Sequence, residues 1–335
     1  MRVARCPLLL AAAAALSNNA KLSSLRCQWT ELRNAAPSGR SGAACASGPS
    51  GAWLFGGLDD QRAVLDDLWH FDPAPRGGMG LRWRAVDAAG GERPGPRLCA
   101  AAAVVGGDFV VFGGWDMAAK KTLDDCWAHD GAAWRRVGSL PAPCKNHVAV
   151  GLGDRAVVVA DGATYVYADG VVESFPQPTG RAPSARTMAA AARVGDDVRV
   201  FGGVSDGVEL GDAYVLDVAR MDWREVRTTG ASPGPRAGAS AATAAVAPSL
   251  PFVYGGARKV GKALEPLRDL WALDVDAGEW RLLVDGTAEE DAAPPARNAA
   301  CFAPLDESTL LLTNGWQPLV RTFGDAFRLE VDRGD

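Results

Sequence analysis

Three histidines are the first residues to consider for acid–base or metal chemistry. His70, His129 and His147 lie far apart along the chain. The sequence contains neither an H-E-x-x-H zinc motif nor a G-x-S-x-G nucleophile motif. The Gly-Gly pairs, such as Gly113-Gly114, lack the Gly and Lys that follow in a phosphate-binding loop. The sequence therefore predicts no catalytic residues, no metal site and no cofactor.

Seven cysteines could bind zinc or form disulfides, but their spacing indicates neither. They are Cys6, Cys27, Cys45, Cys99, Cys126, Cys144 and Cys301. No C-x-x-C pair and no Cys/His cluster occurs among them. Cys45, Cys99 and Cys301 fall in one repeated segment, and Cys126 falls in another. We expect these thiols to pack as small core side chains.

An internal repeat of about 50 residues organises the chain. Each full copy holds an Arg, an Ala-rich segment, a Val/Phe-rich segment ending in Gly-Gly, an Asp-x-aromatic segment and a Trp. The Val/Phe-rich runs favour buried strands, and the Trp offers a large apolar face for packing between sheets. The repeat arginines are Arg40, Arg97, Arg186, Arg236 and Arg297. The repeat aspartates are Asp67, Asp125, Asp212, Asp269 and Asp325.

Two copies of the repeat are irregular. The third has Cys144 in place of the Arg and Ala160-Asp161 in place of Gly-Gly. The sixth copy ends before its Trp segment. Residues 27–32, around Trp29, form a Trp segment that precedes the first copy and belongs to none of the others. We expect this N-terminal strand to pair with the segment from Asp325 to Glu330 and close the ring.

The Gly-Gly, aromatic and Trp positions of these copies resemble the kelch family, from about Gln28 to Glu330. The resemblance implies an all-β fold, a six-bladed kelch-type β-propeller closed by an N-terminal strand. Residues 27–335 would form the propeller, and residues 1–26 a leader. In such a fold we expect the repeat aspartates to make turn or strand hydrogen bonds and the repeat arginines to make hydrogen bonds between blades.

Kelch-like enzymes provide the alternative to a binding function. Copper oxidases that resemble this fold need a Tyr, Cys and His set, and iron-dependent specifier proteins need spaced Glu, Asp and His ligands; neither pattern is found here. Sugar mutarotases of similar fold rely on scattered polar residues. A mutarotase-like enzyme acting on a sugar or another small molecule therefore stays open, although catalysis is not the favoured interpretation.

The net charge bears on the class of partner, and the N-terminal segment bears on the cellular compartment. A net charge of -5 gives no reason to expect binding to nucleic acid.

The first twenty residues have a basic start and an apolar stretch from Cys6 to Leu16. This is the layout of a targeting segment, and the apolar stretch is too short for a membrane span. The alternatives are the secretory pathway, an organelle or, without targeting, the cytoplasm.

The loops after the Gly-Gly pairs carry the candidate binding residues. These are Arg62, Trp115, Lys120, Arg258, Lys259, Trp316 and Arg321. Such loops should share one rim of a propeller, and Trp and Arg are favoured anchors at interfaces. The sequence thus predicts a scaffold or adaptor whose rim loops bind a protein or peptide partner with acidic groups.

Overall fold

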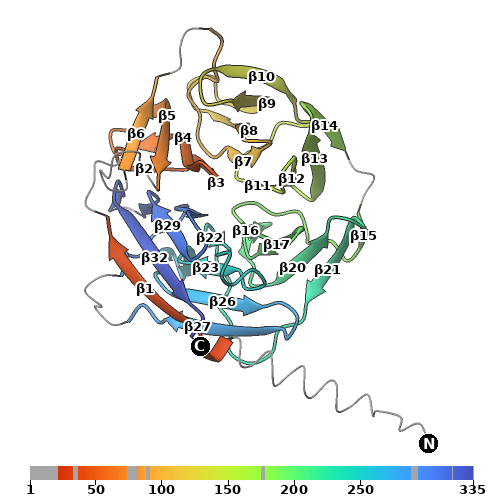
Figure 1. Ribbon diagram of the computed structural model, residues 1–335, viewed down its shortest axis with the longest axis vertical. Helices are drawn as coiled ribbons and strands as arrows, with labels where there is room; N and C mark the ends of the chain where they lie inside the picture. Colours follow the sequence, from red (N-terminus) through yellow and green to blue (C-terminus); the bar gives the residue numbers. More distant parts are fainter. Residues whose placement is uncertain are drawn as a thin grey trace, which may run out of the picture.

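Six small β-sheets stand around a central axis and form the six blades of a propeller (Figure 1). The structure is a computed structural model that describes residues 22–32, 37–73, 82–87, 91–174, 178–287, 293–318 and 320–334. Within each blade neighbouring strands are antiparallel, except that residues 179–180 pair in parallel with residues 222–223 in the fourth blade. The prediction of an all-β, six-bladed kelch-type propeller is confirmed.

The first three blades follow the chain in order. Blade 1 consists of β2 (Arg40–Ser41), β3 (Ala44–Gly48), β4 (Gly51–Asp59), β5 (Val64–Asp72) and β6 (Arg82–Val86). Blade 2 consists of β7 (Ala101–Val105), β8 (Asp108–Asp116), β9 (Lys121–His129) and β10 (Trp134–Ser139). Blade 3 consists of β11 (Val148–Gly151), β12 (Arg155–Ala160), β13 (Ala163–Ala168) and β14 (Val171–Ser174).

The last three blades carry additional short strands. Blade 4 consists of β15 (Thr179–Gly180), β16 (Ala190–Val194), β17 (Asp197–Phe201), β20 (Ala213–Asp217) and β21 (Asp222–Val226), with β18 (Val204–Ser205) and β19 (Val208–Glu209) as a separate hairpin. Blade 5 consists of β22 (Ser240–Ala242), β23 (Phe252–Tyr254), β26 (Leu270–Asp274) and β27 (Glu279–Val284), with the hairpin β24 (Ala257–Val260) and β25 (Ala263–Pro266). Blade 6 consists of β28 (Cys301–Pro304), β29 (Thr309–Thr313), β32 (Ala326–Asp332) and β1 (Arg26–Glu31), with the hairpin β30 (Trp316–Gln317) and β31 (Arg321–Thr322).

The ring is closed by the N-terminal strand, as predicted. β1 pairs antiparallel with β32, and Trp29 lies opposite Leu329. Figure 1 shows β1 as the outer strand beside β32. Residues 1–21 lie outside the described residues, so the leader remains a prediction. Leu22 and Leu25 are buried in the same hydrophobic cluster as Trp29.

The core is divided into six hydrophobic clusters, and each cluster fills the space between two neighbouring blades. The repeated Trp, which lies on β1, β6, β10, β21 and β27, is buried in five blades. These residues are Trp29, Trp83, Trp134, Trp223 and Trp280. Aromatic side chains contribute large apolar areas to such contacts, which explains why the repeat retains them.

One expectation about the cysteines is wrong. Cys45 and Cys301 form a disulfide across a Cα–Cα distance of 5.8 Å. Cys45 lies in β3 of blade 1 and Cys301 in β28 of blade 6. The bond therefore joins the inner strands of the first and last blades, which become neighbours only when the ring closes. Cys99 and Cys126 are free, and Cys126 is buried.

Blade 5 offers a matched test of how closely the blades approach. Gly255 and Gly261 have nearly the same φ, 61° and 62°. A Cβ on Gly255 would lie 2.6 Å from the backbone oxygen of Arg297 in blade 6, whereas a Cβ on Gly261 would meet nothing within 4 Å. Gly261→Ala should therefore cost only the left-handed backbone strain, about 1 kcal/mol, and Gly255→Ala about 3 kcal/mol or more. Equal losses in urea unfolding would contradict close contact at this interface.

Candidate partner-binding rim

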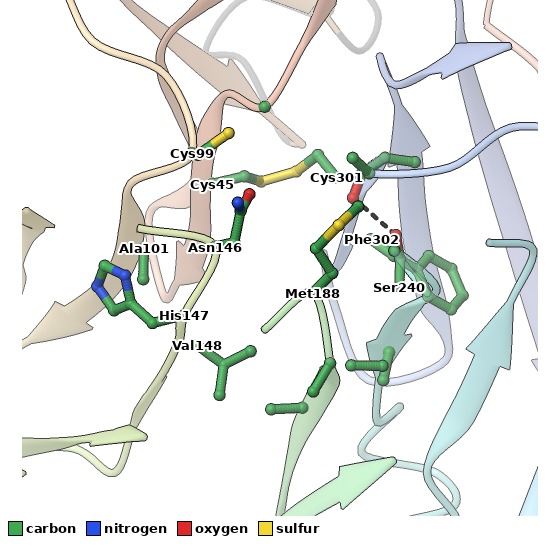
Figure 2. A pocket seen from close by; sticks show the side chains of 18 of the residues that line it. Cys45, Cys99, Ala101, Asn146, His147, Val148, Met188, Ser240, Cys301 and Phe302 are labelled. Carbon is green, nitrogen blue, oxygen red and sulfur yellow. Dashed lines mark hydrogen bonds between the residues drawn. A yellow bond between two sulfur atoms is a disulfide. The ribbon is translucent and has the colours of Figure 1, made fainter. Parts of the chain in front are cut away.

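Six residues with left-handed backbone surround one mouth of the central channel. They stand two positions after each repeat Arg or after Cys144, and are Gly42, Cys99, Asn146, Met188, Gly238 and Ala299. Five backbone hydrogen bonds of 2.7–2.9 Å join them in sequence, each N–H donating to the carbonyl of the preceding member. Figure 2 shows the side chains of Cys99, Asn146 and Met188 at this mouth.

The repeat arginines stand two positions before these residues and form buried hydrogen-bond networks near the same mouth of the channel. Nη1 of Arg236 donates to the Gly255 carbonyl at 3.0 Å and to Asp269 Oδ1 at 2.7 Å, and its Nη2 donates to Oδ2 at 2.9 Å. Trp271 Nε1 also donates to Asp269, at 2.7 Å. All five repeat arginines pair with the repeat aspartate in this way.

These side-chain networks lie within a blade, contrary to the expectation of hydrogen bonds between blades. Beside these networks, backbone hydrogen bonds link neighbouring blades: the N–H of Gly203 in blade 4 donates to the carbonyl of Arg236 in blade 5 at 2.9 Å. Burial raises the pKa of Asp67, but hydrogen bonds from Arg40 and Trp69 outweigh burial and lower this pKa overall. The hydrogen-bonding groups of the repeat arginines are therefore used within the blades and are not available to a ligand.

The predicted binding residues lie on the connections that follow the glycines in four blades. Arg62 lies between β4 and β5 in blade 1, Trp115 and Lys120 lie at the β8–β9 connection in blade 2, and Arg258 and Lys259 lie in β24 of blade 5. Trp316 and Arg321 lie in β30 and β31 of blade 6. All five cations are exposed, and both Trp residues are partly exposed.

The two rim Trp residues are held by backbone pairing with the inner segment of their own blade. Trp115 pairs with Leu98, and Trp316 pairs with Asn298. The Nζ atom of Lys145, from blade 3, lies 3.7 Å from the centre of the Trp115 ring. A cation at this distance over an indole is favourable. Lys145 is therefore a rim residue that the sequence analysis missed.

Not all the rim cations are equally available to a partner. Arg258 Nε donates to Glu265 at 2.8 Å, within the β24–β25 hairpin. The guanidinium of Arg321 lies 4.7 Å from the ring of Phe323. Lys259 is exposed on the same hairpin as Arg258. A partner carboxylate would have to compete with Glu265 for Arg258, which makes Lys259 the better probe of charge on this hairpin.

Exposed apolar side chains gather on the same connections. Seven large apolar residues of the described chain are exposed, and five belong to these connections: Met117, Val208, Val260, Leu264 and Val320. They come from four blades. An apolar residue at a hairpin tip gains no burial in the free protein, so a partner that covered these connections would bury additional apolar area. In the sequence, these apolar residues could have been identified by their position in the segments that follow the Gly-Gly pairs.

The two ends of the channel open into cavities lined mainly by small side chains. The mouth at the rim opens into a cavity of about 230 Å³, and the opposite end into one of about 640 Å³ lined largely by Ala, Gly and Pro. The charged side chain at the larger cavity, Arg193, bonds the Gly195 carbonyl and Asp196. Within the described ranges, no group of three His, Cys, Asp or Glu is placed to hold a metal ion.

The three histidines are buried, and burial lowers the pKa of each. His147 lies beside the channel between blades 2 and 3, and burial lowers its pKa to about 4, opposed by the Phe112 backbone. The unfolded chain therefore binds more protons between about pH 6.5 and 4. The contribution of neutral His147 to the free energy of unfolding should be fully present above pH 6.5. It should fall by about 3 kcal/mol as the pH drops through this window.

His147→Ala tests this pH dependence. Alanine already occupies the equivalent position in the other five blades: Ala43, Ala100, Ala189, Ala239 and Ala300. The variant should lose less stability than the wild type between pH 7 and pH 4 in urea titrations, whatever its stability at pH 7. An unchanged loss over this range would show that His147 does not account for it.

Comparison with known proteins shows partial similarity to several curated proteins. It is 35% identical over 156 residues to serine/threonine-protein phosphatase BSL2 of Arabidopsis thaliana, which covers 44% of this chain and 14% of that protein. It is 25% identical over 259 residues to acyl-CoA-binding domain-containing protein 4 of Arabidopsis thaliana, covering 70% of this chain and 37% of that protein. It is 29% identical over 124 residues to Kelch domain-containing protein 2 of Bos taurus, covering 37% of this chain and 28% of that protein.

The chain thus spans well under half the length of these curated relatives. No helix among the described residues is long and apolar enough to cross a membrane. The family profile of the KLHDC2/KLHL20/DRC7 Kelch-repeats domain matches residues 16–175 and 171–315. With six blades, repeated Gly-Gly strand ends and this match over nearly the whole chain, the protein belongs to the kelch-repeat family.

Proposed function

We propose that this protein is a binding scaffold whose rim, the connections after the glycines, holds a protein or peptide partner with acidic groups. The observation that carries the proposal is the coincidence of three kinds of side chain on those connections. Partly exposed Trp, exposed cations and exposed apolar residues occur together there. Interfaces favour this combination because aromatic and Arg side chains act as anchors.

Charge supports the same partner chemistry. The whole chain carries a net charge of -5, yet the connections of blades 2 and 5 carry Lys120, Lys121, Lys259 and Lys262. A local basic surface on an acidic protein attracts carboxylates and speeds encounter with an acidic partner. A mutarotase-like enzyme has less support, because the described cavity linings present no set of paired acid and base groups.

Alanine substitution of the rim Trp residues tests the proposal. A partner would first be identified by affinity capture and mass spectrometry, and its affinity then measured with purified proteins. Trp115→Ala or Trp316→Ala should weaken binding at least about tenfold, since an anchor typically contributes about 2 kcal/mol or more. Lys259→Glu should mainly slow association.

The matched control lies on the opposite face. Arg220 is exposed in the turn between β20 and β21, away from the rim. Arg220→Glu should leave affinity unchanged. If the rim variants fold and bind normally while Arg220→Glu weakens binding, the opposite face is the interface and the rim proposal is wrong.

We also propose that the N-terminal segment directs the protein to the secretory pathway. The Cys45–Cys301 disulfide supports this alternative over the cytoplasm, because disulfides persist mainly in oxidising compartments. N-terminal sequencing of the protein from its native source tests the proposal. An intact Met1 would count against cleavage of a leader.

A further inference from the structure

Blade 3 breaks the regular pattern of the rim. In the other blades the chain continues beyond the glycines into a longer connection, such as the hairpin β24–β25 in blade 5. In blade 3 only Asp161 and Gly162 separate β12 from β13. The rim therefore lacks a hairpin at blade 3, and a gap is left between the connections of blades 2 and 4.

The order of the blades predicts a floor and two walls for this gap. Its floor contains Lys145 and Asn146 from the start of blade 3, together with the turn at Asp161. One wall is the β8–β9 connection of blade 2, which carries Trp115. The other wall is the β18–β19 hairpin of blade 4.

Lys145 occupies this gap because its own blade offers it no partner strand. In blades 2, 4, 5 and 6 the equivalent residue pairs with the segment that follows the glycines, as Leu98 pairs with Trp115. The described structure assigns Lys145 no such bridge, and its ammonium lies over Trp115 of the neighbouring blade. The gap is thus lined by an exposed cation and a partly exposed indole.

The two sides of the gap have opposite charge. Lys120 stands on the blade 2 wall, and the ammonium of Lys145 lies over Trp115 of that wall from the floor, whereas Asp206 and Glu209 stand on the blade 4 hairpin. Each wall also carries an exposed apolar residue, Met117 on one and Val208 on the other. A narrow ligand with both kinds of charge and with apolar side chains would complement these residues.

At its inner end the gap leads to the channel mouth. Asn146 belongs both to the floor of the gap and to the lining of the mouth cavity of about 230 Å³ (Figure 2). This volume is below the range of roughly 300–1,000 Å³ that is typical of small-molecule pockets. It suits the insertion of one side chain better than that of a whole cofactor.

We propose that the gap over blade 3 is a groove for an extended peptide segment of the partner, with an acidic residue at Lys145, a basic residue at the blade 4 hairpin and one side chain in the channel mouth. The inference rests on the proposed rim function and narrows it to one sector. A folded domain covering the whole rim would contact blades 5 and 6 equally. A segment in the groove would depend on blades 2, 3 and 4.

A phage-displayed library of random short peptides, selected on the full chain, supplies the probe. The selected peptides should carry an acidic and a basic residue, and synthetic versions should bind in fluorescence polarisation. Lys145→Glu should weaken binding at least about tenfold, and exchange of the peptide's acidic residue for Lys should restore binding to this variant. Selection of no peptide, or full binding by Lys145→Glu, would overturn the groove.

A second variant fills the groove. Residues 257–266, the hairpin of blade 5, would replace Asp161 and Gly162 of blade 3 and build the missing hairpin. Peptide binding should be lost, whereas Lys259→Glu in blade 5 should leave it intact. If this insertion prevents folding, as judged by circular dichroism, the surface variant Lys145→Glu still decides the outcome.

The same variants separate the groove from the wider rim proposal. If Trp316→Ala and Lys259→Glu abolish binding of the selected peptide while Lys145→Glu and the filled variant retain it, the groove is wrong and the rim function stands. If rim and groove variants all bind normally, both proposals fall.

Discussion

Replacing Arg236 with methionine should lower the free energy of unfolding by about 3–5 kcal/mol, the cost of breaking a buried ion pair on one side. The guanidinium of Arg236 is only 4% exposed and makes two hydrogen bonds to the Asp269 carboxylate. Without Arg236, that carboxylate keeps the indole N–H of Trp271 and loses its counter-charge. Chemical denaturation of the two proteins measures the difference.

The same blade contains a control pair in a different environment. Arg258 and Glu265 also form an ion pair, at 2.8 Å, but both side chains are about half exposed. Arg258→Met should leave stability nearly unchanged because solvent screens exposed pairs. If the two substitutions cost the same, the buried networks beneath the rim are not a main source of stability in the blades.

Removing the disulfide should have an effect of similar size. Cys45→Ala with Cys301→Ala should lower the free energy of unfolding by about 2–5 kcal/mol, because the bond closes a loop with a sequence separation of 256. Alanine stands at the equivalent inner-strand positions, such as Ala101 for Cys301 and Ala102 for Cys45, so the substitutions introduce no bulk.

A reductant provides the control for the disulfide. Dithiothreitol should lower the stability of the wild type to that of the double variant and leave the double variant unaffected. Thiol titration of the denatured wild type should find two fewer thiols before reduction than after it. Equal thiol counts would show that the bond does not form.

Much of the fold could be predicted from the sequence because each blade repeats the same local signals. The strand that closes the ring was identified by elimination, since Trp29 belonged to no copy, and its pairing with β32 confirms that prediction. The Cys45–Cys301 bond was missed although its signal was present. Both cysteines lie in inner strands, of the first and last copies, and closure brings those two strands together.

The details of the rim could not be predicted because they depend on contacts between blades. The position of Lys145 over Trp115 follows from the missing hairpin of blade 3, which the degenerate third copy signals only indirectly. The pairing of Arg258 with Glu265 depends on the register of the β24–β25 hairpin. Composition places charges on the rim, but only this geometry shows which of them remain available to a partner.

Hydrogen–deuterium exchange of the protein, free and bound to its captured partner, tests the proposed rim function most directly. Binding should slow exchange in the connections after the glycines, residues 58–63, 116–121, 257–266 and 316–318, and in the floor of the gap at residues 144–147. Exchange at the opposite end of the channel, around residues 104–108 and 193–197, should not change. Slowed exchange confined to that opposite end would contradict binding through the rim.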